Sequence, residues 1–150
     1  MTKRCLLSMA VILATLFSAF TAVAQTGTQT PKESEVAGYL KQGLVVFLCF
    51  HDAKEPNLDK IKSDITDVVI NFKGAVGGVY VSGDDKKEDS LRGKFKIQPN
   101  ETAVFIVQPS GNAAAKLTGS DITKTNLMKA VVSSCRGGSC GSGCGSRCGQ

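Results

Sequence analysis

The sequence predicts an α/β domain with a mixed four-stranded sheet and helices on both of its faces. Three observations predict this fold class. Residues 44–50 form an unbroken apolar run, which is typical of a strand buried on both faces. Residues 58–72 place apolar side chains every three or four positions, as an amphipathic helix does. The segment Gln-Pro-Ser-Gly-Asn at 108–112 has the composition of a tight turn between two strands.

The first half of the domain alternates between helix and strand. The predicted elements are a helix over 31–42 that begins at Pro31 and stops at Gly43, a strand over 44–50, a helix over 58–72 that stops at Lys73-Gly74, and a strand over 76–81. Residues 51–56 form a polar turn after the first strand. Two strands joined by a long helix imply a parallel pair.

The second half completes the sheet with an antiparallel pair. Its predicted elements are a polar loop over 82–88, a short helix over 90–95, strands over 102–107 and 113–117, and a last helix containing Leu127 and Val131. Asp121 or Thr123 is suited to cap that helix. Asp84 and Asp85 lack the spacing of a calcium loop, so the loop that holds them is predicted to be a solvated surface.

The first 24 residues have the pattern of a signal peptide. Lys3 and Arg4 precede an apolar run over 6–23, and Ala22-Val23-Ala24 supplies the small residues that signal peptidase recognises. We expect cleavage near Ala24, export to the periplasm or medium, and contact with a membrane only through this segment. Residues 25–34 are predicted to be a disordered leader, followed by one domain over 35–134.

The charge of the chain does not favour nucleic acid as a partner. Removal of Lys3 and Arg4 lowers the formal net charge from +5 to +3, because the signal segment holds two basic residues and no acidic one. Lysines and acids alternate along the rest of the domain, without a basic stripe interleaved with aromatic residues.

Much of the domain resembles the thioredoxin-like fold. The resemblance covers residues 35–134. It is carried by the strand over 44–50, the segment Leu-Arg-Gly-Lys-Phe-Lys-Ile at 91–97, and the segment Thr-Ala-Val-Phe-Ile-Val at 102–107, which is followed by Pro-Ser-Gly and a strand ending in Gly119. The resemblance implies a sheet whose strand over 44–50 leads into the active-site turn of the family.

The active-site residues of the family are absent from the matching positions. Asp52 and Glu55 stand where the family has the two cysteines of Cys-x-x-Cys, Glu101 stands where it has a cis-proline, and Val46 stands where it has a buried acid. Carboxylates cannot exchange disulfides. We therefore expect a redox-inactive variant of the fold, without the dithiol active site of an oxidoreductase.

The polar turn still offers a candidate binding face, formed by His51, Asp52, Glu55 and Glu101. Imidazole and two carboxylates at a strand end could ligate a metal ion. Acids after a strand also stabilise the start of the following helix, and this second interpretation is preferred. The face is then a surface for docking a partner protein.

The last sixteen residues form a Gly/Ser-rich tail with four cysteines, namely Cys135, Cys140, Cys144 and Cys148. We expect this tail, over 135–150, to be flexible, so that all four sulfurs can surround one soft ion such as Zn²⁺ or Cu⁺. An oxidising compartment could instead join them as two disulfides, and the tail could then act as a thiol relay or redox sensor toward a thiol-containing protein. The sequence favours the metal slightly, because the tail has no core for a disulfide to fasten.

Overall fold

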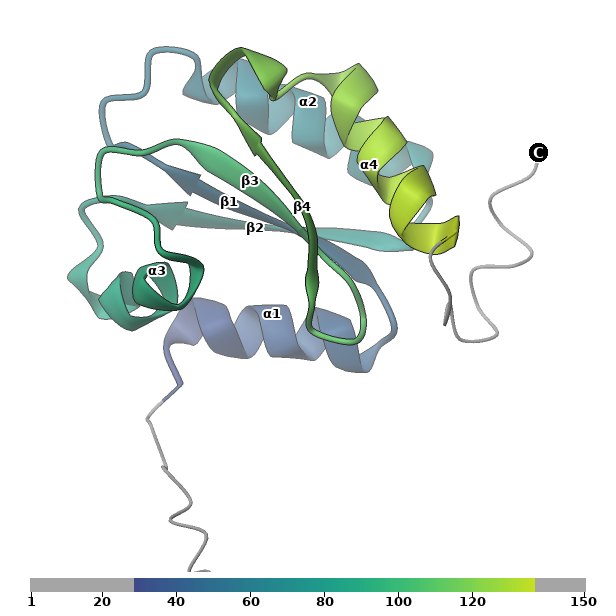
Figure 1. Cartoon of the computed structure of the whole chain (residues 1–150), viewed down its shortest axis with the longest axis horizontal. Coiled ribbons are helices and arrows are strands. Elements are labelled where there is room, and N and C mark those ends of the chain that lie inside the picture. Colours follow the sequence, from purple (N-terminus) through teal and green to yellow (C-terminus); the bar gives the residue numbers. More distant parts are fainter. Residues whose placement is uncertain (1–28, 137–150) are drawn as a thin grey trace, which may run out of the picture.

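The computed structural model describes residues 29–136, which form one four-stranded sheet between two layers of helices (Figure 1). The strand order is β2-β1-β3-β4. The elements are α1 (Pro31–Lys41), β1 (Val45–His51), α2 (Leu58–Asn71), β2 (Val76–Ser82), α3 (Asp89–Phe95), β3 (Ala103–Val107), β4 (Ala113–Thr118) and α4 (Lys124–Arg136), with short 3₁₀ helices at Lys86–Glu88 and Gly119–Asp121. The predicted fold class is confirmed.

Strand β1 lies inside the sheet, between β2 and β3, and all seven of its residues are buried. It pairs in parallel with β2 and antiparallel with β3, while β4 pairs antiparallel with β3 at the edge. Successive side chains of a strand point to opposite faces. Val45, Phe47 and Cys49 accordingly join one hydrophobic cluster, and the residues between them join the other. The unbroken apolar run is therefore explained by a core on each side.

Helices α2 and α4 cover one face of the sheet, and α1 and α3 cover the other (Figure 1). The apolar stripe of α2 contributes Ile61, Ile65 and Val68 to the first core, and α4 contributes Leu127 and Val131. The second core contains three mutually packed phenylalanine rings, Phe50, Phe95 and Phe105, whose centroids lie 4.8–5.8 Å apart. Tilted and edge-to-face arrangements of this kind are favoured over a face-to-face sandwich.

The helix ends follow the capping residues of the sequence. Thr30 accepts a hydrogen bond from the Glu33 amide at 3.1 Å, and Pro31 occupies the first helical position of α1. Gly43 follows α1 with a φ of 76°, a conformation that glycine adopts without strain. Of the two predicted caps for α4, Thr123 accepts a hydrogen bond from the Asn126 amide at 3.3 Å.

The loop over 82–88 differs in part from the solvated surface that the sequence predicts. Glu88 is only 1% exposed, and its Oε1 accepts a hydrogen bond from the Lys32 amide at 3.1 Å. Lys32 lies in the first turn of α1, whose free N–H groups and positive dipole end attract a carboxylate. Asp84 remains exposed, as expected. The acid at the end of the loop thus fastens α1, whereas the acid near its start faces solvent.

Two further observations concern the ends of the described chain. Helix α4 runs through Arg136, so its last turn includes Cys135, which the sequence assigns to the flexible tail. None of the helices within residues 29–136 is long and apolar enough to cross a membrane.

Candidate functional site

Three chain segments meet at the carboxyl ends of β1 and β2. His51 ends β1 opposite Ser82, and the Gly83 amide donates a hydrogen bond to the His51 carbonyl at 2.8 Å. A Cβ added to Gly83 would lie 1.9 Å from the carbonyl oxygen of Pro99. Position 83 therefore requires glycine, because the loop after β2 contacts the backbone of the loop before β3 at this point.

Thr102 links the polar turn after β1 to the loop before β3. Its hydroxyl donates to Glu55 Oε2 at 2.7 Å and accepts from the Asp52 amide at 3.2 Å. Two of the four predicted face residues, Asp52 and Glu55, are therefore joined through a residue that lies 47 positions beyond Glu55. Thr102 is half-buried, so the link lies at the surface.

Asp52 and Glu55, which the sequence resemblance places opposite the dithiol of the thioredoxin-like fold, also support their own turn. Asp52 Oδ1 accepts from the Lys54 amide at 3.1 Å, and Glu55 Oε1 accepts from the Asn57 amide at 3.2 Å, immediately before α2. Both amides precede the first residue of α2, so these carboxylates stabilise the turn itself, and no side chain caps the start of the helix. Val46, at the position of the family's buried acid, is fully buried among apolar residues.

His51 and Glu101 lie at the same end of the sheet but are engaged differently. His51 is 8% exposed, and its Nδ1 lies 3.0 Å from the Asp52 carbonyl oxygen. Glu101 turns toward β4 and forms an ion pair with Lys116 at 2.7 Å. The hydrogen bond from Lys116 holds the pKa of Glu101 below its ordinary value. The four predicted residues therefore share one end of the sheet without converging on one point.

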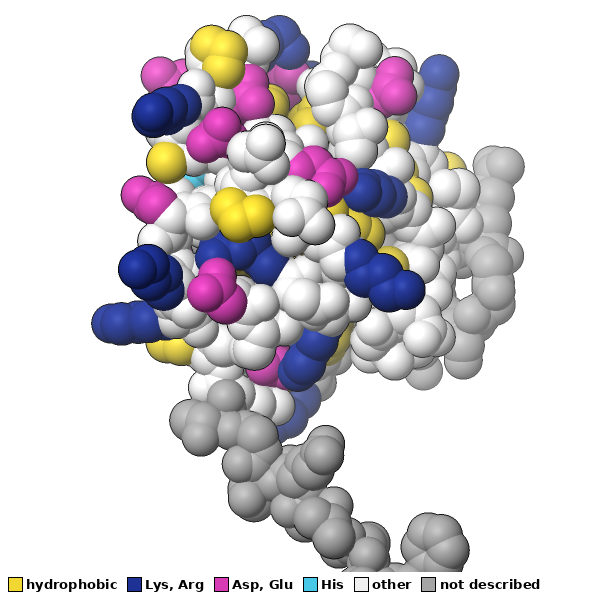
Figure 2. Space-filling view, turned by 60° about the vertical axis from the view of Figure 1, so that its left-hand side comes forward, with side chains coloured by type: hydrophobic (Ala, Val, Ile, Leu, Met, Phe, Trp, Pro, Cys, Tyr) yellow, Lys and Arg dark blue, Asp and Glu magenta, His cyan; other side chains and the backbone are white. Residues whose placement is uncertain are grey.

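Within residues 29–136, no group of three or more His, Cys, Asp or Glu side chains is placed to hold a metal ion. The alternative three-ligand site at His51, Asp52 and Glu55 is therefore not formed. The surface around this end carries basic and acidic side chains in alternation, as Figure 2 shows. Such a surface does not create a strong field of one sign. It offers contacts to polar groups of either sign.

Arg92 is a site residue that sequence reasoning missed. Its side chain is buried, and it donates to the carbonyl oxygens of Ser82 at 2.5 Å and Asp85 at 3.1 Å and pairs with Asp89. These bonds hold the loop after β2 against α3. The helical pattern of residues 90–95 predicts the helix but not the burial of the Arg92 side chain. The carbonyl groups that accept its hydrogen bonds belong to Ser82 and Asp85, which lie outside that helix.

The thiols of the chain fall into two environments. Cys49 lies in β1 with no exposed surface, and burial raises its pKa from 9.0 to about 12. Cys135 lies in the last turn of α4, and the predicted ligands Cys140, Cys144 and Cys148 fall outside the described residues. The end of α4 is held by Gln108, whose side-chain amide donates to the Ser134 carbonyl at 3.1 Å.

No family model matches the sequence, and no curated protein matches it. Among solved structures, the chain is similar to one described as the structure of a malarial protein, with a TM-score of 0.51 and 12% identity. The match covers 60% of this chain and 96% of that one. At this identity the likeness concerns the fold alone.

Proposed function

We propose that the protein is an exported thioredoxin-like scaffold that has no dithiol chemistry at its strand end and that binds one soft metal ion through Cys135, Cys140, Cys144 and Cys148. Zn²⁺ and Cu⁺ are the ions that four thiolates suit best. The proposal depends on four cysteines that stand close together in a Gly/Ser-rich sequence, whereas Cys49 is buried in the domain. Its thiol is fully enclosed and stays protonated at neutral pH, so it can neither exchange disulfides nor ligate an ion from solvent.

The strand end supports the same conclusion. Asp52 and Glu55 are bound to backbone amides and to Thr102, so both carboxylates already serve the local structure. If the signal segment with Cys5 is removed, the cysteines other than the buried Cys49 all lie after residue 134. The domain acts as a carrier, and the end of α4 is the point from which the cysteines extend.

The end of α4 is suited to this role because it is fixed on the domain. The hydrogen bond from Gln108 satisfies one of the carbonyl groups that a helix leaves free at its last turn. The Ser134 hydroxyl donates to the Val131 carbonyl at 2.8 Å. The first proposed ligand, Cys135, therefore lies on a helix that the domain holds in place, and glycine and serine make up most of the sequence between it and the other three.

Native mass spectrometry of the protein isolated from the cells that make it tests this function. We expect one bound ion, which is lost when the four tail cysteines are replaced by serine and retained in the matched Cys49→Ala variant. Lowering the pH should release the ion, because each thiol must lose its proton to ligate. A metal-free mass lower by two hydrogens per cysteine pair, with alkylation only after reduction, would identify disulfides and overturn the proposal.

A further inference from the structure

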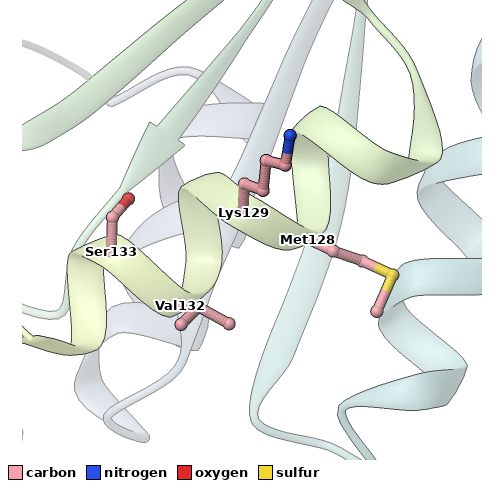
Figure 3. Close-up of a pocket in the computed structure, with 4 residues that line it drawn as sticks. All are labelled: Met128, Lys129, Val132 and Ser133. Carbon is pink, nitrogen blue, oxygen red and sulfur yellow. The ribbon is translucent and has the colours of Figure 1, made fainter.

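The outer side of α4 leaves apolar side chains in solvent. Met128 and Val132, one helical turn apart, are 36% and 41% exposed. Together with Lys129 and Ser133 they line an open hollow of about 370 Å³, and we name these four residues the α4 face (Figure 3). In Figure 3, Met128 and Val132 leave the helix on one side and Lys129 and Ser133 on the other. A hollow of this size is in the range of about 300–1,000 Å³ that binding pockets occupy.

The α4 face is not needed to build the core. The opposite side of the helix, at Leu127, Ala130 and Val131, is the part that packs against the sheet and α2. The free energy of folding gained by burying α4 therefore comes from that side. Met128 and Val132, which are partly exposed side by side, therefore give α4 a small apolar surface that is open to a partner.

Charge indicates what that contact is. From Ile122 to the end of the sequence there are four basic residues, Lys124, Lys129, Arg136 and Arg147, and no acidic residue. Lys124 pairs with Asp67 at 2.9 Å, whereas Lys129 takes part in none of the ion pairs formed within residues 29–136. The two apolar side chains of the α4 face, Met128 and Val132, thus lie beside the positive charge of Lys129, which has no ion-pair partner among the described residues.

Other occupants fit this surface less well. A second copy in a two-fold dimer would bring a second Lys129 into the same interface, and like charge in one interface disfavours association. The segment after α4 carries Arg147, no acid and mainly glycine and serine, so it has neither the charge nor the apolar side chains to fill the hollow. A partner that complements the face needs apolar anchors flanked by acids.

We infer that the α4 face docks an acidic amphipathic helix of a partner protein. Such a helix inserts apolar side chains spaced at i and i+3 or i+4 between Met128 and Val132 and sets carboxylates beside Lys129. Cys135 lies two residues beyond Ser133, so the docked partner is held next to the first tail cysteine. Exchange of a metal ion with that partner rests on the proposed function, whereas docking itself does not.

Binding of a synthetic peptide tests the inference. The probe is a fluorescein-labelled amphipathic helix with leucine on one side and glutamate on the other, titrated with protein expressed from its full-length sequence. We expect binding that weakens as NaCl rises from about 20 mM to about 300 mM, since salt screens the charge of Lys129. Lys129→Glu and Val132→Ser should each raise the Kd about tenfold, which equals about 1.4 kcal/mol.

Matched controls separate docking from general charge effects. Lys41→Glu makes the same charge change at the exposed end of α1, on the other side of the sheet, and should leave the Kd within about twofold. A peptide with lysine in place of glutamate should bind much more weakly. Equal effects of Lys41→Glu and Lys129→Glu, equal binding of both peptides, or a dimer that dissociates on Val132→Ser would overturn the inference.

The same titration distinguishes failure of docking from failure of metal binding. In the variant with four tail serines, we expect the peptide to bind with unchanged Kd although the metal ion is lost. Circular dichroism melting should show that the Lys41, Lys129 and Val132 variants keep their fold, because these side chains are exposed. Loss of peptide binding in the serine variant would show that the tail, and not the α4 face, forms the contact.

Discussion

At the scale of single residues, position decides what each thiol of this chain can do. Cys49 follows Leu48 in the central strand and pairs in register with Tyr80, where no water reaches it. Without solvation the thiolate is disfavoured, and the pKa of Cys49 rises to about 12. The residue therefore behaves as a small apolar side chain.

This raised pKa predicts a loss of stability at alkaline pH. The folded pKa of Cys49 exceeds its unfolded value of 9.0, so its contribution to stability is complete below pH 9 and is lost as pH rises toward 12. In that window the unfolded thiol ionises while the folded one stays protonated, and the free energy of unfolding falls by about 1.4 kcal/mol per pH unit. Urea denaturation under reducing conditions, from about pH 8 to about pH 11, measures this slope.

The matched variant Cys49→Ala isolates the contribution of the thiol. Every other ionisable group is present in both proteins, so the difference between the two slopes reports the removal of the Cys49 thiol. We expect the variant to be the less stable protein at neutral pH and to lose less stability on the way to high pH. Parallel pH profiles for the two proteins would contradict the buried, protonated thiol.

At the scale of elements, the loops at the carboxyl ends of the strands are locked together by a close backbone contact. Gly83 lies against the Pro99 carbonyl and donates its amide to His51, while Thr102 binds Asp52 and Glu55. These contacts join the turn after β1, the loop after β2 and the loop before β3. Because these contacts join three segments, we expect the backbone of the candidate binding face to be held in one arrangement.

A pair of glycine substitutions tests this contact. Gly83→Ala would place its Cβ 1.9 Å from the Pro99 oxygen, so backbone must move, and we expect the free energy of unfolding to fall by about 1–3 kcal/mol or more. Gly93→Ala in α3 is the control, because nothing lies within 4 Å of its Cβ position. It should raise stability by about 0.5–1 kcal/mol, as alanine is the better helix former. Equal urea midpoints for the two variants would show that the loops do not touch.

At the scale of the whole molecule, two cores enclose β1, and all of their described members precede residue 135. The last fully buried apolar side chains of the chain that the structure describes are those of Leu127 and Val131 in α4. Ser134 is the final buried residue for which exposure is described, and its carbonyl is held by Gln108. The described fold therefore rests on contacts made before residue 135.

Truncation tests the independence of the tail from the fold. A chain that ends at Arg136 should melt within about 4 °C of the full chain, since a change below about 0.5 kcal/mol shifts Tm by about 2–4 °C at most for a domain of about 100 residues. Leu127→Ala is the control, because the removal of a fully buried side chain costs about 2–5 kcal/mol. Thermal unfolding followed by circular dichroism measures both. A truncated chain that melts as low as Leu127→Ala would contradict this account.

The sequence by itself determines the order and type of the elements. The apolar run of β1, the helical periodicity of α2 and the Pro-Ser-Gly turn before β4 each lie within one short segment, and each agrees with the structure to within a few residues. Such patterns are readable because a side chain's face in a helix or strand is fixed by its immediate neighbours. The mixed sheet follows from the connections between these elements.

Only the tertiary structure decides which distant side chains meet. The Thr102 bond to Glu55, the ion pair of Glu101 with Lys116 and the burial of Glu88 at the start of α1 join residues 47, 15 and 56 positions apart. A polar residue in a loop carries no periodic signal for its partner. Such a residue is buried only where a helix end or a carbonyl group of another element lies beside it. The packing of the sheet with both helix layers decides where those groups lie.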